Sequence, residues 1–359
     1  MYKSTELEIN KLLGIVLQKN ASDLHLVAGK PPTIRIDSRL VELKDYDILS
    51  GAAISSMVDV LLGTDDRRKQ FKENLELDFS YAYKDNVRFR VNVYLQKGYV
   101  AAALRLIASK IQTVEDLNLP PELLKFTEFK QGLVLVVGPT GHGKSTTLAA
   151  LIDKINHTRE ENILTIEDPI EYVYVADKCL INQREVGQDT KSFGKALRSV
   201  LREDANVVLV GEMRDFESIA TTITLAETGH LVFATLHTND ASQTIDRIID
   251  VFPAYQQNQT RSQLSSILLG VISQRLLPKI GGGRLPAVEI MLNNNAVSNV
   301  IREGKTYELP NIINTSTASG MVSLDRSLAQ MVQNNIVKME DAVLFASDPD
   351  TLQSLIGRG

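Results

Sequence analysis

Hydrophobic positions in the first part of the chain follow two patterns in turn. Apolar residues recur with helical spacing over residues 5–19, which predicts an amphipathic helix. The segment SDLHLV then predicts a strand, and GKPPTIRIDSRLVEL predicts a hairpin that turns at Asp37 and Ser38. Ser50 is placed to cap a further helix that ends at Gly63.

Residues 75–107 alternate between apolar and polar positions in three runs, which KDN and QKG separate. Such alternation predicts an antiparallel meander with one buried face. We therefore expect residues 1–107 to form a small α+β domain, followed by a connector over residues 108–130. In the middle run, Val87, Phe89, Val91 and Val93 share one face, and Arg88, Arg90 and Asn92 share the other.

The pattern changes from residue 131 to short, continuously apolar runs that alternate with helical segments. The runs LVLVVG, NILTIED, NVVLVGE and HLVFATL are typical of buried parallel strands in an α/β domain with right-handed crossovers. After about residue 255 the pattern is mostly helical, interrupted by PKIGGGRLPAVEIML, whose three glycines predict a hairpin or a flexible loop. Residues 131–359 are thus expected to form an α/β domain with a helical C-terminal portion.

Composition narrows the classes of function. Hydrophobic residues make up 43% of the 359 residues and charged residues 23%, which is ordinary for a globular protein. The net charge of -5 disfavours the broad basic face that nucleic-acid binding requires. No apolar run approaches the ~20 residues that cross a bilayer, so we expect any membrane role to be peripheral and cytoplasmic. The single cysteine, Cys179, excludes a multi-cysteine zinc site and is expected to be a small buried residue.

A phosphate-binding loop is the clearest motif. Residues 138–145, GPTGHGKS, match G-x-x-x-x-G-K-S/T at every fixed position, between a predicted strand and a predicted helix. Backbone N–H groups and the helix N-terminus converge on phosphate oxygens in such loops. Lys144 is expected to reach the β- and γ-phosphates of ATP, and Ser145 to ligate Mg²⁺. His142 occupies a position that the motif leaves free, and we predict a neutral, solvent-facing side chain. The predicted nucleotide-binding residues are Gly138, Pro139, Thr140, Gly141, His142, Gly143, Lys144, Ser145 and Thr146.

Two carboxylates follow predicted buried strands. A Walker B strand usually ends in an Asp on the Mg²⁺ side, but VVLVGE carries Gly211 there, so Glu212 is predicted to take that role. Glu167 ends the strand in TIEDPIEY, at the sheet edge where ligands bind in open α/β sheets. We predict that Glu167 orients or deprotonates the attacking water, whereas a cap or loop ion pair suits Asp168 better.

Two histidines bracket the predicted strand HLVFATLH. His230 and His237 are seven positions apart, so a regular strand would point them to opposite faces. No Cys or His cluster accompanies them in the sequence, so a metal site is not predicted. Each fits a sensor of the γ-phosphate or a contact to a neighbouring subunit, and a structural histidine with satisfied hydrogen bonds is an equal alternative.

The motifs together resemble a known family. GPTGHGKSTT, ILTIEDPIEY, VVLVGEMRD and AETGHLVFATLHTNDASQTIDRIIDVFP occur in the order of the Walker A, Asp, Walker B and His boxes of the type II/IV secretion ATPases. SDLHLVAGKPPTIRIDSRL and AVSNVIREGK resemble the N-terminal domain and the C-terminal Ala-Ile-Arg-Asn-Leu-Ile-Arg-Glu motif of the branch that retracts type IV pili. The resemblance implies a PAS-like N-terminal domain, a RecA-like core and a homohexamer that hydrolyses ATP with Mg²⁺.

The resemblance also assigns residue roles by position in the motifs. Two departures limit it: Ser298 replaces the first Arg of the C-terminal motif, and DSR lacks the usual turn glycine. The first departure puts the coupling of hydrolysis to movement in doubt, but not ATP binding. The implied catalytic set is Glu167, Glu212, His230 and His237, with Arg90 and Arg105 reaching the nucleotide of an adjacent subunit and Ser145 and Glu212 on the metal.

The resemblance implies a motor for pilus retraction and twitching motility, acting through a platform protein at the cytoplasmic face of the inner membrane. An accessory retraction ATPase is the nearer alternative, since EDAVLFASDPDTLQSLI resembles that group, whereas GEMRD favours the main retraction ATPase. Pilus-extension and type II secretion ATPases carry a four-cysteine zinc insertion, which a single cysteine disfavours. The acidic charge disfavours a DNA-transfer ATPase, and the lack of an N-K-x-D motif disfavours a GTPase.

Overall fold

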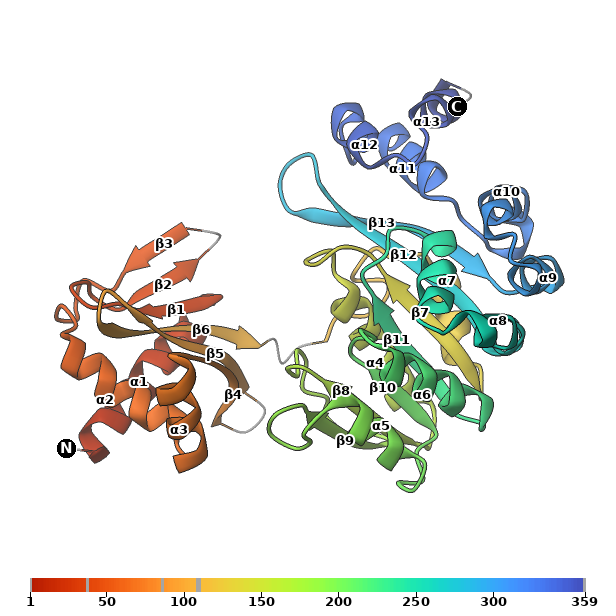
Figure 1. Ribbon diagram of the computed structural model, residues 1–359. Coiled ribbons are helices and arrows are strands. Elements are labelled where there is room, and N and C mark those ends of the chain that lie inside the picture. The colour runs from red at the N-terminus through yellow and green to blue at the C-terminus, as the bar shows by residue number, and fades with distance from the viewer. Residues whose placement is uncertain (1, 37–38, 85–86, 108–110, 358–359) are drawn as a thin grey trace. The chain divides into compact units, whose positions relative to one another are not determined.

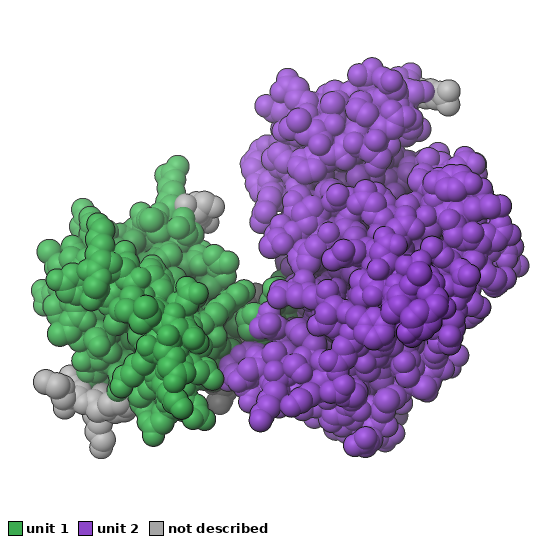
Figure 2. Space-filling model, in the orientation of Figure 1, with its two compact units in different colours: residues 1–110, 169–175 green, residues 111–168, 176–359 purple. Residues whose placement is uncertain are grey.

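The computed structural model describes residues 2–36, 39–84, 87–107 and 111–357 (Figure 1). The chain divides into two compact units, which Figure 2 colours separately. Unit 1 comprises residues 1–110 and 169–175, and unit 2 comprises residues 111–168 and 176–359. The predicted turns at 37–38 and 85–86, and the start of the predicted connector at 108–110, lie outside the described residues.

Unit 1 is a six-stranded antiparallel sheet in the order β3-β2-β1-β6-β5-β4, with three helices against one face (Figure 1). The predicted alternation of β5 is confirmed, because Phe89, Val91 and Val93 are fully buried while Arg90 and Asn92 are exposed. Its elements are α1 (Tyr2–Gln18), β1 (Asp23–Leu26), β2 (Thr33–Ile36), β3 (Arg39–Glu42), α2 (Gly51–Leu62), α3 (Asp65–Asn74), β4 (Glu76–Lys84), β5 (Val87–Gln96) and β6 (Tyr99–Ile107).

Helix α2 has the ends that the sequence predicts. The Ser50 hydroxyl accepts a hydrogen bond from the Ala53 N–H at 3.1 Å, which satisfies a backbone donor that the first turn leaves without a helical partner. Gly63 follows with a φ of 68°, in the region that glycine enters without steric cost. Helix α3 has no buried residue, and its charged sequence gave no amphipathic pattern from which to predict it.

Unit 2 contains a seven-stranded sheet in the order β13-β12-β7-β11-β10-β8-β9, flanked by helices (Figure 1). Neighbouring strands are parallel except for the antiparallel pair β12 and β13. The predicted α/β class with a RecA-like core is confirmed, and Cys179 is buried as predicted. The elements up to the hairpin are η1 (Pro121–Thr127), β7 (Gly132–Val137), α4 (Lys144–Thr158), β8 (Asn162–Glu167), β9 (Leu180–Glu185), α5 (Phe193–Val200), β10 (Val207–Val210), α6 (Phe216–Glu227), β11 (Leu231–Leu236), α7 (Ala241–Asp250), α8 (Ala254–Ile267), β12 (Leu268–Pro278) and β13 (Arg284–Leu292).

The C-terminal part of unit 2 is helical, as predicted, and the triple glycine lies in the turn of the β12–β13 hairpin. Helices α11 to α13 pack on that hairpin through buried residues that include Leu277 and Ala287, and we call these three helices the C-terminal bundle (Figure 1). Among the described helices, none combines the length and hydrophobicity needed to cross a bilayer. The elements are α9 (Asn295–Glu303), η2 (Thr306–Glu308), α10 (Leu309–Thr315), η3 (Thr317–Ser319), α11 (Leu324–Gln333), α12 (Met339–Phe345) and α13 (Pro349–Gly357).

The carboxyl ends of the parallel strands bring the candidate residues together. Strands β7, β8, β10 and β11 lie side by side and point the same way, so the residues that follow them share one edge of the sheet. These residues are Gly138 after β7, Glu167 at the end of β8, Glu212 after β10 and His237 after β11. Open α/β sheets bind their ligands at this edge.

Candidate nucleotide-binding site

The glycines of the loop at residues 138–145, the P-loop, let it lie directly on strand β12. A Cβ on Gly138 would be 2.5 Å from the carbonyl oxygen of Gln274, and one on Gly143 would be 2.7 Å from the Gln274 side-chain nitrogen. Both glycines also have positive φ, 144° and 85°, which side chains rarely tolerate. A buried hydrogen bond of 2.7 Å from the Thr147 hydroxyl to the Gln274 side-chain oxygen holds helix α4 against the same strand.

Lys144 is buried in the mouth of this loop. Its Nζ donates to the carbonyl oxygens of Gly138 at 2.8 Å and Pro139 at 3.1 Å, and lies 3.4 Å from Nδ1 of His237. Ser145 follows in the first turn of α4, where backbone N–H groups lack helical partners and the helix dipole is positive. The loop, the ammonium and the helix terminus therefore offer one concentrated site for an anion such as a polyphosphate.

Glu167 is 8% exposed at the end of β8, and its carboxylate is fixed by two donors. The Thr165 hydroxyl donates to Oε1 at 2.7 Å, and the Gln183 side-chain amide donates to the same oxygen at 3.3 Å. Gln183 comes from β9, whose residues pair with those of β8 in parallel register. A carboxylate held in one orientation at the ligand edge has the geometry of a positioned proton acceptor.

Gly211 explains why this chain has no Asp at the end of its Walker B strand. A Cβ at this position would lie 3.1 Å from the carbonyl oxygen of Ile166 and 3.2 Å from Cα of Glu167. Any side chain would therefore press on the backbone that carries Glu167. The close approach of β10 to β8 moves the acidic side chain one residue on, to Glu212.

If Glu167 is the catalytic carboxylate that its position predicts, Gly211→Ala should lower kcat about tenfold or more, because a small displacement of such a group is costly, while ATP affinity stays the same. Steady-state ATPase assays and nucleotide titration measure the two quantities. Gly14→Ala is a matched control, since its added Cβ meets a similar contact at 3.2 Å, from the Tyr83 hydroxyl in unit 1. A normal kcat for Gly211→Ala would show that the approach of the strands does not position Glu167.

Glu212 is an ionised carboxylate that lies between the side chains of Arg214 and His237. Arg214 Nη2 lies 2.7 Å from Oε2, and His237 Nε2 lies 3.1 Å from Oε1. Burial by itself raises the pKa of Glu212, but the hydrogen bond from Arg214 and the interactions with His237 outweigh it, so the pKa is lowered. The side chain thus keeps its negative charge, as an oxygen ligand for a hard cation must.

His237 lies between the P-loop and Glu212. Its Nε2 faces Glu212, while Nδ1 faces Lys144 and the Thr140 hydroxyl, each at 3.4 Å. The carboxylate beside Nε2 is an acceptor, so Nε2 can donate a proton toward Glu212. One imidazole therefore connects the P-loop to the Walker B carboxylate.

His230 lies at the other end of strand β11, before Leu231. Its Nδ1 is 3.0 Å from the carbonyl oxygen of Leu225 and 3.3 Å from the Thr228 hydroxyl, so its ring contacts are within its own turn. The structure does not bring His230 to the P-loop edge of its own subunit. This geometry agrees with the alternative that His230 is a structural histidine with satisfied hydrogen bonds. A contact to a neighbouring subunit stays a prediction.

Arg90 and Arg105 lie opposite each other on neighbouring strands of unit 1. Arg90 pairs with Asp78 at 3.0 Å, and Nε of Arg105 donates to Oδ1 of Asp23 at 2.9 Å. Asp23 is 6% exposed, whereas the Arg105 side chain is 70% exposed. Asp23 thus holds the Arg105 guanidinium through Nε, while most of the arginine side chain stays exposed. Both arginines belong to unit 1 and the P-loop to unit 2, so their action on one nucleotide stays a prediction.

His142 is only partly exposed, and its ring is held against β12 and α12, so the prediction of a solvent-facing side chain is wrong. Its Nδ1 accepts a hydrogen bond from the backbone N–H of Leu276 at 2.9 Å, and its ring meets Phe345 edge to face at 6.2 Å between centroids. The neutral state is as predicted, because burial lowers the pKa of His142 and the cations Arg275, Lys144 and Arg284 lower it further.

The sequence interpretation missed the residues that support the site from β8 itself and from strands β9 and β12. Gln274 lies behind the P-loop, and Thr165 and Gln183 hold Glu167. The polar run Ser273, Gln274 and Arg275 inside an otherwise apolar segment is a signal that could have identified β12, since buried polar residues need partners.

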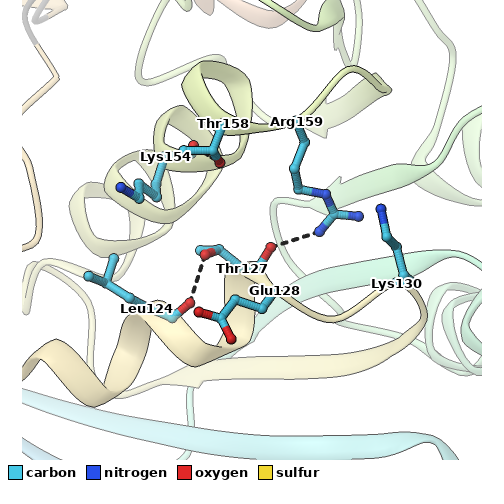
Figure 3. A pocket seen from close by; sticks show the side chains of 7 residues that line it. All are labelled: Leu124, Thr127, Glu128, Lys130, Lys154, Thr158 and Arg159. Atoms are coloured by element: carbon cyan, nitrogen blue, oxygen red, sulfur yellow. Dashed lines mark hydrogen bonds between the residues drawn. The ribbon is translucent and has the colours of Figure 1, made fainter.

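A separate pocket of about 430 Å³ lies at the carboxyl end of α4, against η1 (Figure 3). Figure 3 shows the Arg159 guanidinium directed to the Thr127 carbonyl, to which it donates at 2.7 Å. Glu161 pairs with both Arg159 and Lys130. The charges of Arg159 and Lys130 are therefore compensated, unlike the P-loop with its converging donors, and we do not place a phosphate there.

A glycine loop with a buried lysine and two carboxylates, at the carboxyl edge of a RecA-like sheet, defines a P-loop ATPase. A family model described as type II/IV secretion system protein matches residues 3–344. The chain belongs to this family, as the sequence motifs indicated.

Individual relatives agree with this assignment. The chain is 46% identical to the type IV pilus retraction ATPase PilT of Pseudomonas aeruginosa, over 96% of this chain and 99% of the relative. It is 37% identical to the type IV pilus ATPase PilU of the same organism, over 98% and 92% of the two chains. A crystal structure of the pilus retraction motor PilT with bound ADP matches with a TM-score of 0.90 and 45% identity, covering 96% of this chain and 99% of that one.

Proposed function

We propose that this chain is an ATP-hydrolysing motor of the PilT type, which powers retraction of type IV pili and hence twitching motility. The observation that carries the proposal is 46% identity to PilT across 96% of the chain, together with the P-loop, Glu167, Glu212 and His237 at one sheet edge. The PilT structure with ADP supports a nucleotide as the ligand of this edge.

ATP binds in this proposal with its phosphates in the P-loop, where Lys144 exchanges its carbonyl partners for phosphate oxygens. Ser145 and Glu212 would hold Mg²⁺, and the lowered pKa of Glu212 fits a hard cation that prefers charged oxygen ligands. When bound, the ion supplies charge stabilisation to the phosphates. Glu167 orients and deprotonates the attacking water, since it is the carboxylate fixed by Thr165 and Gln183.

The working form is a homohexamer in which unit 1 of one subunit supplies Arg90 and Arg105 to the nucleotide of its neighbour. An exposed guanidinium anchored by a buried carboxylate supports this role, because it is held in place and still open to a partner. The hexamer would act at the cytoplasmic face of the inner membrane, on the platform protein of the pilus machinery.

Helix α9 is the candidate element that couples hydrolysis to movement. The Ser298 hydroxyl lies within hydrogen-bond distance of the Ser265 carbonyl oxygen, at 2.9 Å, and of Asn293 Oδ1, at 3.0 Å, which ties α9 to α8 where related proteins carry an Arg. A polar surface pocket of about 570 Å³ lies beside it. Its lining residues are Ser265, Ser266, Asn293, Asn294, Asn295, Ser298, Asn299 and Arg302.

We predict that Arg302→Ala slows pilus retraction and leaves ATPase activity close to wild type, since the side chain lines this pocket and lies outside the nucleotide site. Retraction rates in cells and ATPase rates of the purified protein measure the two effects. Lys305→Ala removes a nearby cation that does not line the pocket and serves as the control. Loss of both activities together would indicate a folding defect instead of uncoupling.

Deletion of the gene in its native cell, with imaging of pili, tests the proposed function. Cells with many pili that do not retract would support a retraction motor, whereas cells without pili would contradict it and indicate an extension motor. A PilU-like accessory role is the second candidate, because PilU matches over 98% of the chain. Retraction that persists at low load after deletion would favour that role.

A further inference from the structure

His142 connects the P-loop to the strand behind it. The loop places His142 between Gly141 and Gly143, and its Nδ1 accepts the Leu276 N–H at 2.9 Å. Leu276 lies on β12 near the end of its pairing with β13. This hydrogen bond reinforces the close packing of Gly138 and Gly143 on Gln274, two residues earlier in the same strand.

The strand continues from this hydrogen bond directly into the C-terminal bundle. Leu277, the next residue after Leu276, is fully buried in the cluster that packs α11 to α13 on the hairpin. The bundle also reaches the P-loop itself, because Phe345 at the end of α12 meets the His142 ring edge to face, at 64° between the planes. His142 is therefore linked to the bundle in two ways: through its hydrogen bond to Leu276, the neighbour of Leu277, and through its direct contact with Phe345.

The hydrogen bond requires an imidazole whose Nδ1 carries no proton. The charged groups that face His142 are Lys144 from α4, Arg275 from β12 and Arg284 from β13, and all three are cations. They disfavour a second proton on the ring, so the acceptor at Nδ1 is maintained. The ring also contacts the apolar Phe345 side chain from α12.

We propose that His142 is a positioning residue that holds the P-loop in its phosphate-binding conformation and couples it to the C-terminal bundle. Because coupling free energies are reciprocal, nucleotide in the P-loop then stabilises the packing of α12, and disturbing α12 weakens nucleotide binding. The inference rests on the proposed function in one respect, that the P-loop binds ATP.

The first test compares three substitutions in the full-length protein by fluorescent-ATP titration and steady-state ATPase assays. His142→Ala removes the acceptor, and we expect Kd and KM to rise about tenfold with kcat little changed, as for loss of one buried hydrogen-bond partner. His142→Asn places Oδ1 where Nδ1 lies and is expected to restore binding. His142→Gln places its oxygen one bond farther along and serves as the matched control that does not restore it.

The second test perturbs the bundle. Phe345→Ala is expected to raise Kd about threefold, in line with loss of one ring contact, although Phe345 is distant from the P-loop in sequence. In a double-mutant cycle with His142→Ala the two effects should be less than additive, because they share one contact. Hydrogen exchange should show ATP protecting α12 in the wild type and not in Phe345→Ala. Melting temperatures identify variants that fail to fold, and Phe345→Leu then replaces Phe345→Ala.

Unchanged nucleotide affinity in His142→Ala, failure of Asn to rescue, or additive effects in the cycle would each overturn the inference. The proposed function fails separately, if the wild-type protein neither binds nor hydrolyses ATP. If the wild-type protein hydrolyses ATP and the His142 variants bind and hydrolyse it equally well, the role of His142 is rejected and the proposed function stands.

Discussion

Glu167→Gln is expected to remove ATP turnover while ATP still binds. The amide keeps the shape of the carboxylate, and its oxygen can still accept the hydrogen bonds from Thr165 and Gln183, so the end of β8 should be undisturbed. What the substitution removes is the basic oxygen that takes a proton from water, a contribution of about 10² to 10⁴ in rate. ATP affinity should not fall, because the P-loop and Lys144 are unchanged.

Phosphate release measures the turnover of this variant, and titration with ATP measures its binding. Asp168→Asn is the matched control, since it neutralises an exposed carboxylate on the adjacent residue. Turnover at the wild-type rate in Glu167→Gln would refute the assignment, and Glu212 would then be the remaining carboxylate at this edge. Loss of ATP binding as well would show that Glu167 supports the site instead of acting on water.

Arg105→Ala is expected to leave nucleotide binding by an isolated subunit intact and to lower the ATPase rate of the assembled protein by about 10³, the lower bound for a transition-state arginine supplied in trans. The physical reason is the anchoring by Asp23, which fixes the guanidinium at Nε and leaves its outer nitrogens for phosphate oxygens. A guanidinium held in advance loses less conformational freedom when it engages a nucleotide.

Arg88→Ala provides the comparison, since Arg88 comes from the neighbouring strand of the same sheet, opposite Ile107. ATPase rates measured across a range of protein concentration separate assembly from catalysis, because a trans residue acts only in the oligomer. An unchanged rate in assembled Arg105→Ala would remove its proposed role. A reduced rate in Arg88→Ala of the same size would indicate a general effect of positive charge.

Much of the fold follows from local pattern. The alternation around Phe89 predicted a buried face, Ser50 and Gly63 marked the ends of α2, and four apolar runs gave the central parallel strands. Strand β12 was missed because it follows helix α8 without a turn signal and contains the buried polar residues Gln274 and Arg275. These residues are tolerated because Gln274 contacts Thr147 of α4 and Arg275 contacts Asn239, partners that are distant in sequence and that no local pattern contains.

The candidate site, like the fold, could be predicted only in part from the sequence. Lys144, Glu167 and Glu212 could be placed because each follows a predicted strand at its carboxyl end, and parallel strands share that edge. His230 and His237 bracket β11 as predicted, at its opposite ends, so that only His237 follows the strand at the P-loop edge. His142 was misjudged because its partners, Leu276 and Phe345, are far away in sequence, and its exposure depends on elements that had not been predicted.

Residues 169–175 give the two units an unusual connection. Because this segment belongs to unit 1 and both of its neighbours belong to unit 2, the chain crosses between the units three times, after residues 110, 168 and 175. One of these crossings comes directly after Asp168, so the segment that belongs to unit 1 begins only two residues along the chain from Glu167.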